Sequence, residues 1–207
     1  IQPDDKIIIG GNFPTFNGVL KNSILRLNPD GTIDNSFNTG SGYEMPNPYV
    51  GLGSPPIVSG SIRDMKLKSN GQIVISGSFT IFNGINSNST KRISILNSNG
   101  TLDSTFNANF SIDSALAFDL QSDGKIIVHD LVFVANYGVF NHTRRYLKRL
   151  NSNGSLDNSF SLNNTILREE CIGGNCSNNS GEYMRIYTIK CLSSGKILLG
   201  GYFDTTF

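Results

Sequence analysis

The stretch LNPDGTIDNSF at residues 27–37 recurs as LNSNGTLDSTF at 96–106 and as LNSNGSLDNSF at 150–160. Five of the eleven positions are identical in all three copies. An apolar motif alternates with these copies and reads KIIIGGNF (6–13), QIVISGSF (72–79), KIIVHDLVF (125–133) and KILLGGYF (196–203). Two motifs that recur in a fixed order with this spacing indicate a repeat fold.

Each repeat predicts four short antiparallel strands. The first strand is expected at 62–68, 115–121 and 186–192, and a tight Ser/Asn/Asp-Gly turn leads from it into the second. The second strand lies in the apolar motif, and because its apolar runs do not alternate, both of its faces should be buried. The third strand is expected at 24–28, 93–97 and 147–151, and the fourth ends on Phe37, Phe106 or Phe160. No segment shows the periodicity of an amphipathic helix.

These elements predict an all-β fold, a β-propeller built of four-stranded antiparallel blades. About three and a half repeats are present. The predicted blades occupy residues 1–37 (strands two to four), 62–106, 115–160 and 185–207 (strands one and two), with long insertions at 38–61 and 161–184. Propellers typically close with roughly 4 to 8 blades. We therefore expect a partial propeller within a larger ring, which other blades or copies of the same chain complete.

The strings QPDDKIIIGGNF and RLNPDGTIDNSF, at 2–13 and 26–37, resemble the delta-60 repeat. The pattern of that repeat is similar to QPDGKIxVGGxF followed by RLNxDGxLDxSF. The resemblance covers nearly the whole chain. It implies a propeller-type fold in long bacterial secreted or surface proteins and in some bacteriophage tail proteins, and it implies no particular reaction.

Composition narrows the function classes. The 207 residues carry 17 Lys+Arg against 16 Asp+Glu, a net charge of +1, which disfavours electrostatic capture of nucleic acid. No apolar run approaches the roughly 20 residues of a membrane span. The sequence holds no nucleophile elbow, phosphate loop or zinc-protease motif, so we expect neither an enzyme nor a cofactor.

Strand polarity predicts one irregular face. The turns that join the first strand to the second and the third to the fourth have two or three residues, whereas the opposite connections vary widely in length. These variable connections are 14–22, 80–91 and 135–145, together with 38–61, 107–114 and 161–184. Variable loops on a rigid scaffold commonly carry binding sites. The alternative is that they only pad the surface or contact further blades.

Aromatic and charged residues on these connections are the candidate binding residues. Tyrosines on rigid turns offer platforms for sugar rings or protein partners. The segment NHTRR forms a small basic patch for an anionic sugar or an acidic neighbour, or a solvated loop. The candidates are Tyr43, Glu44, Tyr49, Tyr137, His142, Arg144, Arg145, Arg168 and Tyr183.

Cysteine spacing leaves two readings open. Cys171 and Cys176 flank two glycines in CIGGNC, so a disulfide that suits an extracellular protein and a pair of free thiols are both possible. Cys191 falls in an apolar column and predicts a buried structural thiol. A zinc site is disfavoured because four clustered ligands are absent.

Two further patterns favour structural roles. The Asn-x-Asp/Asn-Gly-x-x-Asp repeat superficially suggests a calcium loop, but it lacks the ligand count and the final Glu of an EF-hand. We interpret it as turn chemistry. The structural turn residues are Gly31, Asp34, Gly100, Asp103, Gly154 and Asp157. His129 occupies a column otherwise filled by glycine or serine, which favours a structural substitution over catalysis, with a polar pair to Asp130 as the other reading.

The leading hypothesis is a non-enzymatic binding or structural module outside the cytoplasm. Its most favoured setting is a bacteriophage virion tail, where it would recognise a host-surface glycan or a partner virion protein. One alternative is a secreted or cell-surface bacterial repeat protein. The other is a propeller-type carbohydrate-active enzyme, which would need two carboxylates about 5 to 9 Å apart. For that role the sequence offers only the adjacent Glu169 and Glu170.

Overall fold

The computed structural model describes residues 1–47, 55, 57–86, 92–108, 115–137, 140–162, 166–172 and 185–203. Every regular element among these residues is a β-strand, which confirms the predicted all-β fold. No helix in the described part is long and apolar enough to cross a membrane. The chain divides into two compact units, Ile1–Asn109 and Phe110–Phe207.

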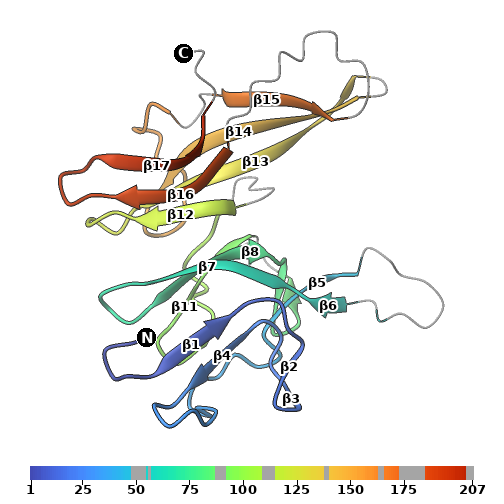
Figure 1. Cartoon of the computed structure of the whole chain (residues 1–207), viewed down its shortest axis with the longest axis vertical. Coiled ribbons are helices and arrows are strands. Elements are labelled where there is room, and N and C mark those ends of the chain that lie inside the picture. Colours follow the sequence, from blue (N-terminus) through green and yellow to red (C-terminus); the bar gives the residue numbers. More distant parts are fainter. Residues whose placement is uncertain are drawn as a thin grey trace. The chain divides into compact units, whose positions relative to one another are not determined.

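The first unit is built from antiparallel sheets that meet around one apolar core (Figure 1). Its repeat strands are β1 (Ile7–Gly10) paired with β4 (Ile24–Leu27), and β11 (Ile93–Leu96), β8 (Ile73–Ser78) and β7 (Ser61–Leu67) in that sheet order. A second set comprises the hairpin β2 (Thr15–Phe16) and β3 (Val19–Leu20), and the sheet β10 (Ile85–Asn86), β9 (Ile81–Phe82), β5 (Tyr43–Pro46) and β6 (Ile57–Ser59). The core consists of Ile24, Phe37, Tyr43, Ile62, Ile73, Ile75, Phe79, Phe82 and Leu96.

The second unit holds one four-stranded sheet and one two-stranded sheet. The first contains β12 (Ala115–Leu120), β13 (Ile126–Tyr137), β14 (Phe140–Leu150) and β15 (Ile166–Ile172), in that order. The second pairs β16 (Arg185–Cys191) with β17 (Ile197–Tyr202). Their common core consists of Ala117, Ile127, Leu147, Ile186 and Ile189.

In the three predicted blades that include a fourth strand, this strand is shortened to a single bridge. Ile33, Leu102 and Leu156 each pair with the last residue of the third strand, and regular pairing stops there. The following aspartate explains the stop. The Asp34 carboxylate accepts the backbone N–H of Ser36 at 2.9 Å, which bends the chain into an Asx turn. Asp103 and Asp157 do the same to the residues two positions after them.

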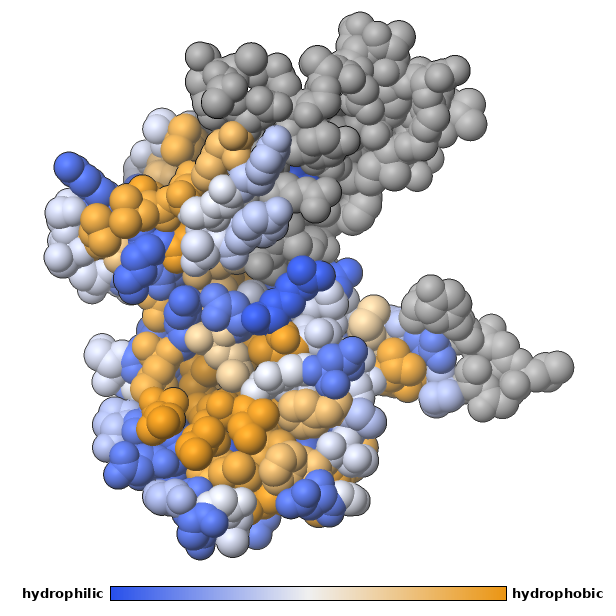
Figure 2. Space-filling view, in the orientation of Figure 1, coloured by the Kyte–Doolittle hydropathy of each residue, from blue (hydrophilic) through white to orange (hydrophobic). Residues whose placement is uncertain are grey.

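Burial of the second strand depends on its neighbours. In β8 and β13 the apolar run is buried, as the non-alternating pattern predicts. The residues of β1 and several of β17 are only half-buried. The cause is that β8 and β13 have a strand on each side, whereas among the described strands β1 pairs with β4 alone and β17 with β16 alone. Figure 2 shows the resulting apolar area over β1 on the visible face of the first unit.

The connections that the sequence predicts as irregular loops contain regular strands. Segment 14–22 folds as β2 and β3 around Asn17 and Gly18, whose φ angles are 48° and 78°. In segment 80–91, the described residues 81–86 repeat this arrangement with β9 and β10 around Asn83 and Gly84. Asn-Gly between apolar residues is a strong hairpin signal, because both positions tolerate positive φ. In segment 135–145 the loop prediction is wrong, since β13 and β14 extend through most of it and pair.

Candidate functional site

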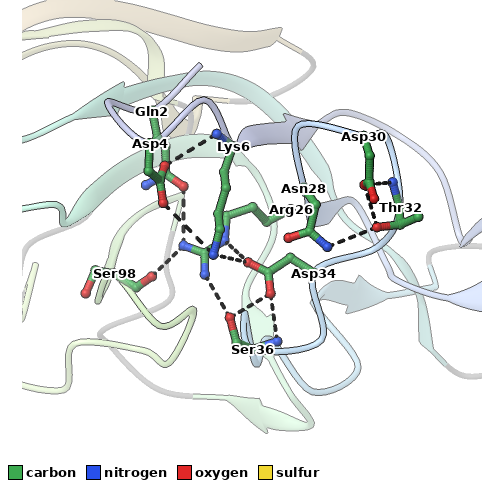
Figure 3. Close-up of polar contacts among 10 residues, drawn as sticks. All are labelled: Gln2, Asp4, Lys6, Arg26, Asn28, Asp30, Thr32, Asp34, Ser36 and Ser98. Carbon is green, nitrogen blue, oxygen red and sulfur yellow. Dashed lines mark hydrogen bonds and ion pairs between the residues drawn. The ribbon is translucent and has the colours of Figure 1, made fainter.

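The aspartates that recur in the three repeats form structural clusters. The Asp34 carboxylate forms ion pairs with Arg26 Nε at 2.8 Å and with Lys6 Nζ at 3.0 Å. The guanidinium of Arg26 lies 4.6 Å from the centre of the Phe37 ring and also donates to the Ser98 carbonyl at 2.9 Å. Figure 3 shows Lys6, Arg26 and Ser98 around Asp34, beside the Asn28–Thr32 turn. The cluster ties the first repeat to the turn of the second.

The third repeat has the same cluster, whereas the second repeat has uncharged residues in place of the two cations. Asp157 receives Arg149 Nε at 2.8 Å and Lys125 Nζ at 2.9 Å, and Arg149 lies over the Phe160 ring. In the second repeat Ile95 and Gln72 hold the corresponding positions, and Asp103 accepts Gln72 Nε2 at 2.9 Å. The turn aspartate of each repeat therefore accepts hydrogen bonds from side chains of neighbouring strands, which are cationic in two repeats and neutral in the second.

Electrostatics agree with a structural role for these carboxylates. Hydrogen bonds from Ser36, and then from Lys6 and Arg26, hold the pKa of Asp34 well below its usual range against the opposing effect of burial. Ser159 and Lys125 do the same for the pKa of Asp157. The structure places Gly31, Gly100 and Gly154 at φ of 83°, 89° and 89°, as such a turn requires. In the described part of the chain no group of three acidic, His or Cys residues is placed to hold a metal ion.

Replacing Asp34 by asparagine should lower the free energy of unfolding by about 2 kcal/mol at pH 7, because the buried Arg26 loses its charged acceptor. The folded chain holds the Asp34 proton less tightly than the unfolded chain, whose aspartate pKa is near 3.8. The stabilisation is therefore complete above that value and is lost as the pH falls further. Urea denaturation at pH 7 and pH 3 should show the variant and parent curves converging in acid.

The matched control for Asp34→Asn is Asp103→Asn in the second repeat. Its hydrogen-bond partner Gln72 is neutral, so this variant leaves no buried cation without a charged acceptor. We expect a cost of less than about 1 kcal/mol there. Equal losses for the two variants would contradict the role assigned to the charged pairs.

One hollow of about 640 Å³ opens in the first unit, between segments that vary among the repeats. The 14–22 connection contributes Pro14, Leu20 and Asn22 to it, and the 38–61 insertion contributes Glu44, Pro55, Ile57, Val58 and Ser59. Asn12 completes the lining. Two of the connections that the sequence assigns to the irregular face therefore meet and enclose a concave surface.

Backbone contacts bring the two segments together. Asn22 and Gly42 form a bridge, and the Tyr43 N–H donates to the Asn22 carbonyl at 2.8 Å. A Cβ on Gly42 would lie 2.2 Å from that carbonyl oxygen, and its φ is +87°, so only glycine allows this approach. The bridge places the side chains of Asn22 and Glu44 beside each other.

Glu44 is the charged residue in the hollow. Its side chain is only 8% exposed, and its Oε1 accepts Asn22 Nδ2 at 3.0 Å. Asn22 Oδ1 in turn accepts the hydroxyl of Ser59 at 2.9 Å. Among the described residues no Lys, Arg or His lies within ion-pair distance of the Glu44 carboxylate. A buried carboxylate without a cation, at the wall of a hollow, is the arrangement in this unit best suited to hold a ligand.

Tyr43 is not an exposed platform, so the sequence interpretation of this residue is wrong. It is 0% exposed, lies with its ring centre 4.3 Å from that of Phe79, and hydrogen-bonds Ser94 through its hydroxyl. The reason is that β5 pairs with β9 and carries Tyr43 into the core. Sequence reasoning had no means of detecting this pairing of two short strands.

The remaining candidates are distributed over the second unit and the undescribed residues. Tyr49, Tyr183 and Cys176 lie outside the described residues. The candidate disulfide between Cys171 and Cys176 therefore also falls outside them. Tyr137 ends β13, His142 and Arg144 lie within β14, and Arg168 and Cys171 lie within β15. Their side chains are outside the described part. The register places Arg144 opposite Glu169 and His142 opposite Cys171.

Arg145 and His129 are buried in the second unit rather than displayed on a loop. Asp130 does not pair with His129, because adjacent strand residues point to opposite faces. It instead binds Lys148 Nζ at 2.7 Å. Burial, and then the charge of Arg145, lower the pKa of His129 to about 4, while a backbone group of Ile186 opposes the shift. Cys191 packs against the core of the second unit but is only half-buried, less than the sequence predicted.

Sequence reasoning missed Asn22, Ser59 and Asn12 at the hollow. Each is a common surface residue type in a segment rich in Asn, Ser and Gly, so composition does not distinguish it. The Asn-Gly hairpin signal at Asn17 would have placed Asn22 directly after a hairpin. It would not have shown which segment Asn22 meets.

Antiparallel sheets that recur with the two sequence motifs define this protein as a β-propeller repeat protein. The chain belongs to the family described as a domain of unknown function (DUF5122) beta-propeller, which matches residues 2–37, 68–106 and 121–160, more than half of the chain. Searches of curated proteins and of solved structures returned no match.

Proposed function

We propose that this protein is a non-enzymatic binding module and that the hollow at Glu44 is its ligand site. The observation that carries the proposal is the hollow itself, because two variable segments on a repeat scaffold enclose a buried carboxylate there. Binding sites commonly lie on variable connections that a rigid scaffold positions. The turn aspartates Asp34 and Asp157 are occupied by structural contacts.

The setting we propose follows from the sequence. Repeats of the delta-60 type, a near-neutral charge and abundant Asn, Ser and Gly suit a rigid part outside the cytoplasm, such as a bacteriophage tail component. A bacterial surface protein has the same features. In either setting the ligand is a host-surface glycan or a partner protein.

Nuclear magnetic resonance titration of the isotope-labelled chain tests the proposal. The probes are glucose, N-acetylglucosamine, glucosamine and Nα-acetyl-lysine methylamide, one at a time. We expect at least one probe to shift the amide signals of Asn22, Glu44 and Ser59, and Leu20→Ser at the exposed rim to weaken that probe several-fold. The matched control is Leu67→Ser, an exposed leucine at the turn end of β7.

Two results would overturn the proposal. One is that no probe shifts the signals of the hollow. The other is that a glycoside probe such as methyl glucoside is hydrolysed during incubation and that Glu44→Gln abolishes the hydrolysis, which would make the site an enzyme's.

A further inference from the structure

We propose that the hollow binds a primary ammonium group on an aliphatic stem, and that its source is a lysine side chain of a partner protein. This inference rests on the proposed function, because it names the ligand class of the same site. Four properties of the hollow carry it, namely its charge, its hydrogen-bonding inventory, its apolar walls and the geometry of its carboxylate.

The charge of the hollow is uncompensated within the described chain. Glu44 is more than nine-tenths buried, and the hydrogen bond from Asn22 is neutral. A ligand cation at this point pairs with the carboxylate and gains a charge-assisted hydrogen bond.

The hydrogen bonds within the hollow leave acceptors free beside the charge. The Ser59 hydroxyl hydrogen is directed to Asn22, and one amide hydrogen of Asn22 is directed to Glu44. The groups left over are Glu44 Oε2, the lone pairs of Ser59, one further amide hydrogen of Asn22 and the amide of Asn12. An ammonium group has three donors and no acceptor, so it suits the charged acceptor Glu44 Oε2 and the neutral oxygens near it.

The walls of the hollow are aliphatic. Pro14, Leu20, Pro55, Ile57 and Val58 line it, and no aromatic ring does so within the described residues. Lysine buries its four-carbon stem along apolar surface while its head reaches a polar group. Sugar rings in contrast are commonly held on aromatic faces, which the described lining residues do not supply.

The geometry of the carboxylate distinguishes lysine from arginine. A guanidinium binds best when both carboxylate oxygens are available for parallel hydrogen bonds. Glu44 Oε1 is already engaged by Asn22, which leaves one oxygen. A compact point charge on a flexible stem fits that single acceptor better than a planar fork.

The test compares two probes that differ only at the head group. Nα-acetyl-lysine methylamide carries the ammonium, and Nα-acetyl-norleucine methylamide has an uncharged methyl in its place. In amide-shift titrations at low salt we expect the lysine probe to bind in the hollow and the norleucine probe to bind at least tenfold more weakly. Glu44→Gln should weaken the lysine probe at least tenfold, because it keeps the shape and the acceptor for Asn22 but removes the charge.

The control variant is Asp4→Asn, which removes the same charge from an exposed turn of the first unit. It should leave the affinity for the lysine probe within twofold of the parent. Equal affinities of the two probes, or an unchanged affinity in Glu44→Gln, would overturn the inference. If glucose or N-acetylglucosamine binds in the hollow and the lysine probe does not, the ligand class is wrong and the proposed site stands. If no probe enters the hollow, both fail.

Discussion

Replacing Tyr43 by alanine should destabilise the first unit by about 4 kcal/mol, the cost typical of removing a large buried aromatic side chain. Tyr43 is completely buried, and its ring centre lies 4.3 Å from that of Phe79 and 4.8 Å from that of Phe82. These three rings join β5 and β9 to the core of the repeat. The truncation leaves a cavity at that junction.

Tyr43→Phe is the matched control for this prediction. It keeps the ring and removes only the hydroxyl that bonds Ser94, so the loss should be about 1 to 2 kcal/mol. Urea denaturation followed by circular dichroism measures both variants, and Tyr43→Leu provides a value if the alanine variant is unfolded. If all three variants lie within 1 kcal/mol of the parent, Tyr43 is not part of the core.

Tyr43 also shows why the site was harder to predict than the repeat. The turn glycine Gly31 and the aspartate Asp34 act within a few residues of their partners, so sequence spacing reveals them. The burial of Tyr43 depends on β5 pairing with β9, almost forty residues away. Such pairing of two short strands leaves no periodic signal, and a Gly- and Pro-rich segment looks like an exposed loop.

The position of Glu44 was predictable only in part, in contrast to the turn residues and to Tyr43. Strand polarity assigned the 38–61 insertion to the irregular face, and the structure brings that insertion against the 14–22 connection there. The partners of Glu44 were not predictable, because Asn22 reaches it only through the close approach at Gly42. A glycine in an insertion has many possible reasons, and only coordinates identify the carbonyl that it admits.

The clusters at Asp34 and Asp157 were partly predictable from the sequence and partly not. Their recurrence is visible in the sequence, whereas the charges that converge on them come from neighbouring strands. Lys6 and Arg26 hold columns that become Gln72 and Ile95 in the second repeat. Both members of the cationic pair are thus replaced together, which is expected if the two side chains act on one carboxylate. Since stability depends on such local ties, each repeat can vary its loops without losing its frame.

His129 should make the stability of the second unit sensitive to pH between about 4 and 6.5. It is 0% exposed, and a backbone group of Ile186 only partly offsets the effect of its burial. Its pKa falls from 6.5 to about 4, first because of burial and then because of Arg145. Between those values the unfolded chain binds a proton that the folded chain does not. The free energy of unfolding should therefore drop by about 3 kcal/mol as the pH falls from above 6.5 to 4.

His129→Ser tests this prediction, because serine already occupies the equivalent buried position at Ser76. The variant loses packing at every pH, but the slope of its unfolding free energy between pH 7 and pH 4 should nearly disappear. His142→Gln is the control, since these two are the only histidines in the chain, and it should retain the slope. An unchanged slope in His129→Ser, or its loss in His142→Gln, would assign the titration elsewhere. The expected result means that the position filled by glycine or serine in the other repeats accepts the imidazole ring of His129 only in its neutral form. The second unit is therefore less stable in acid.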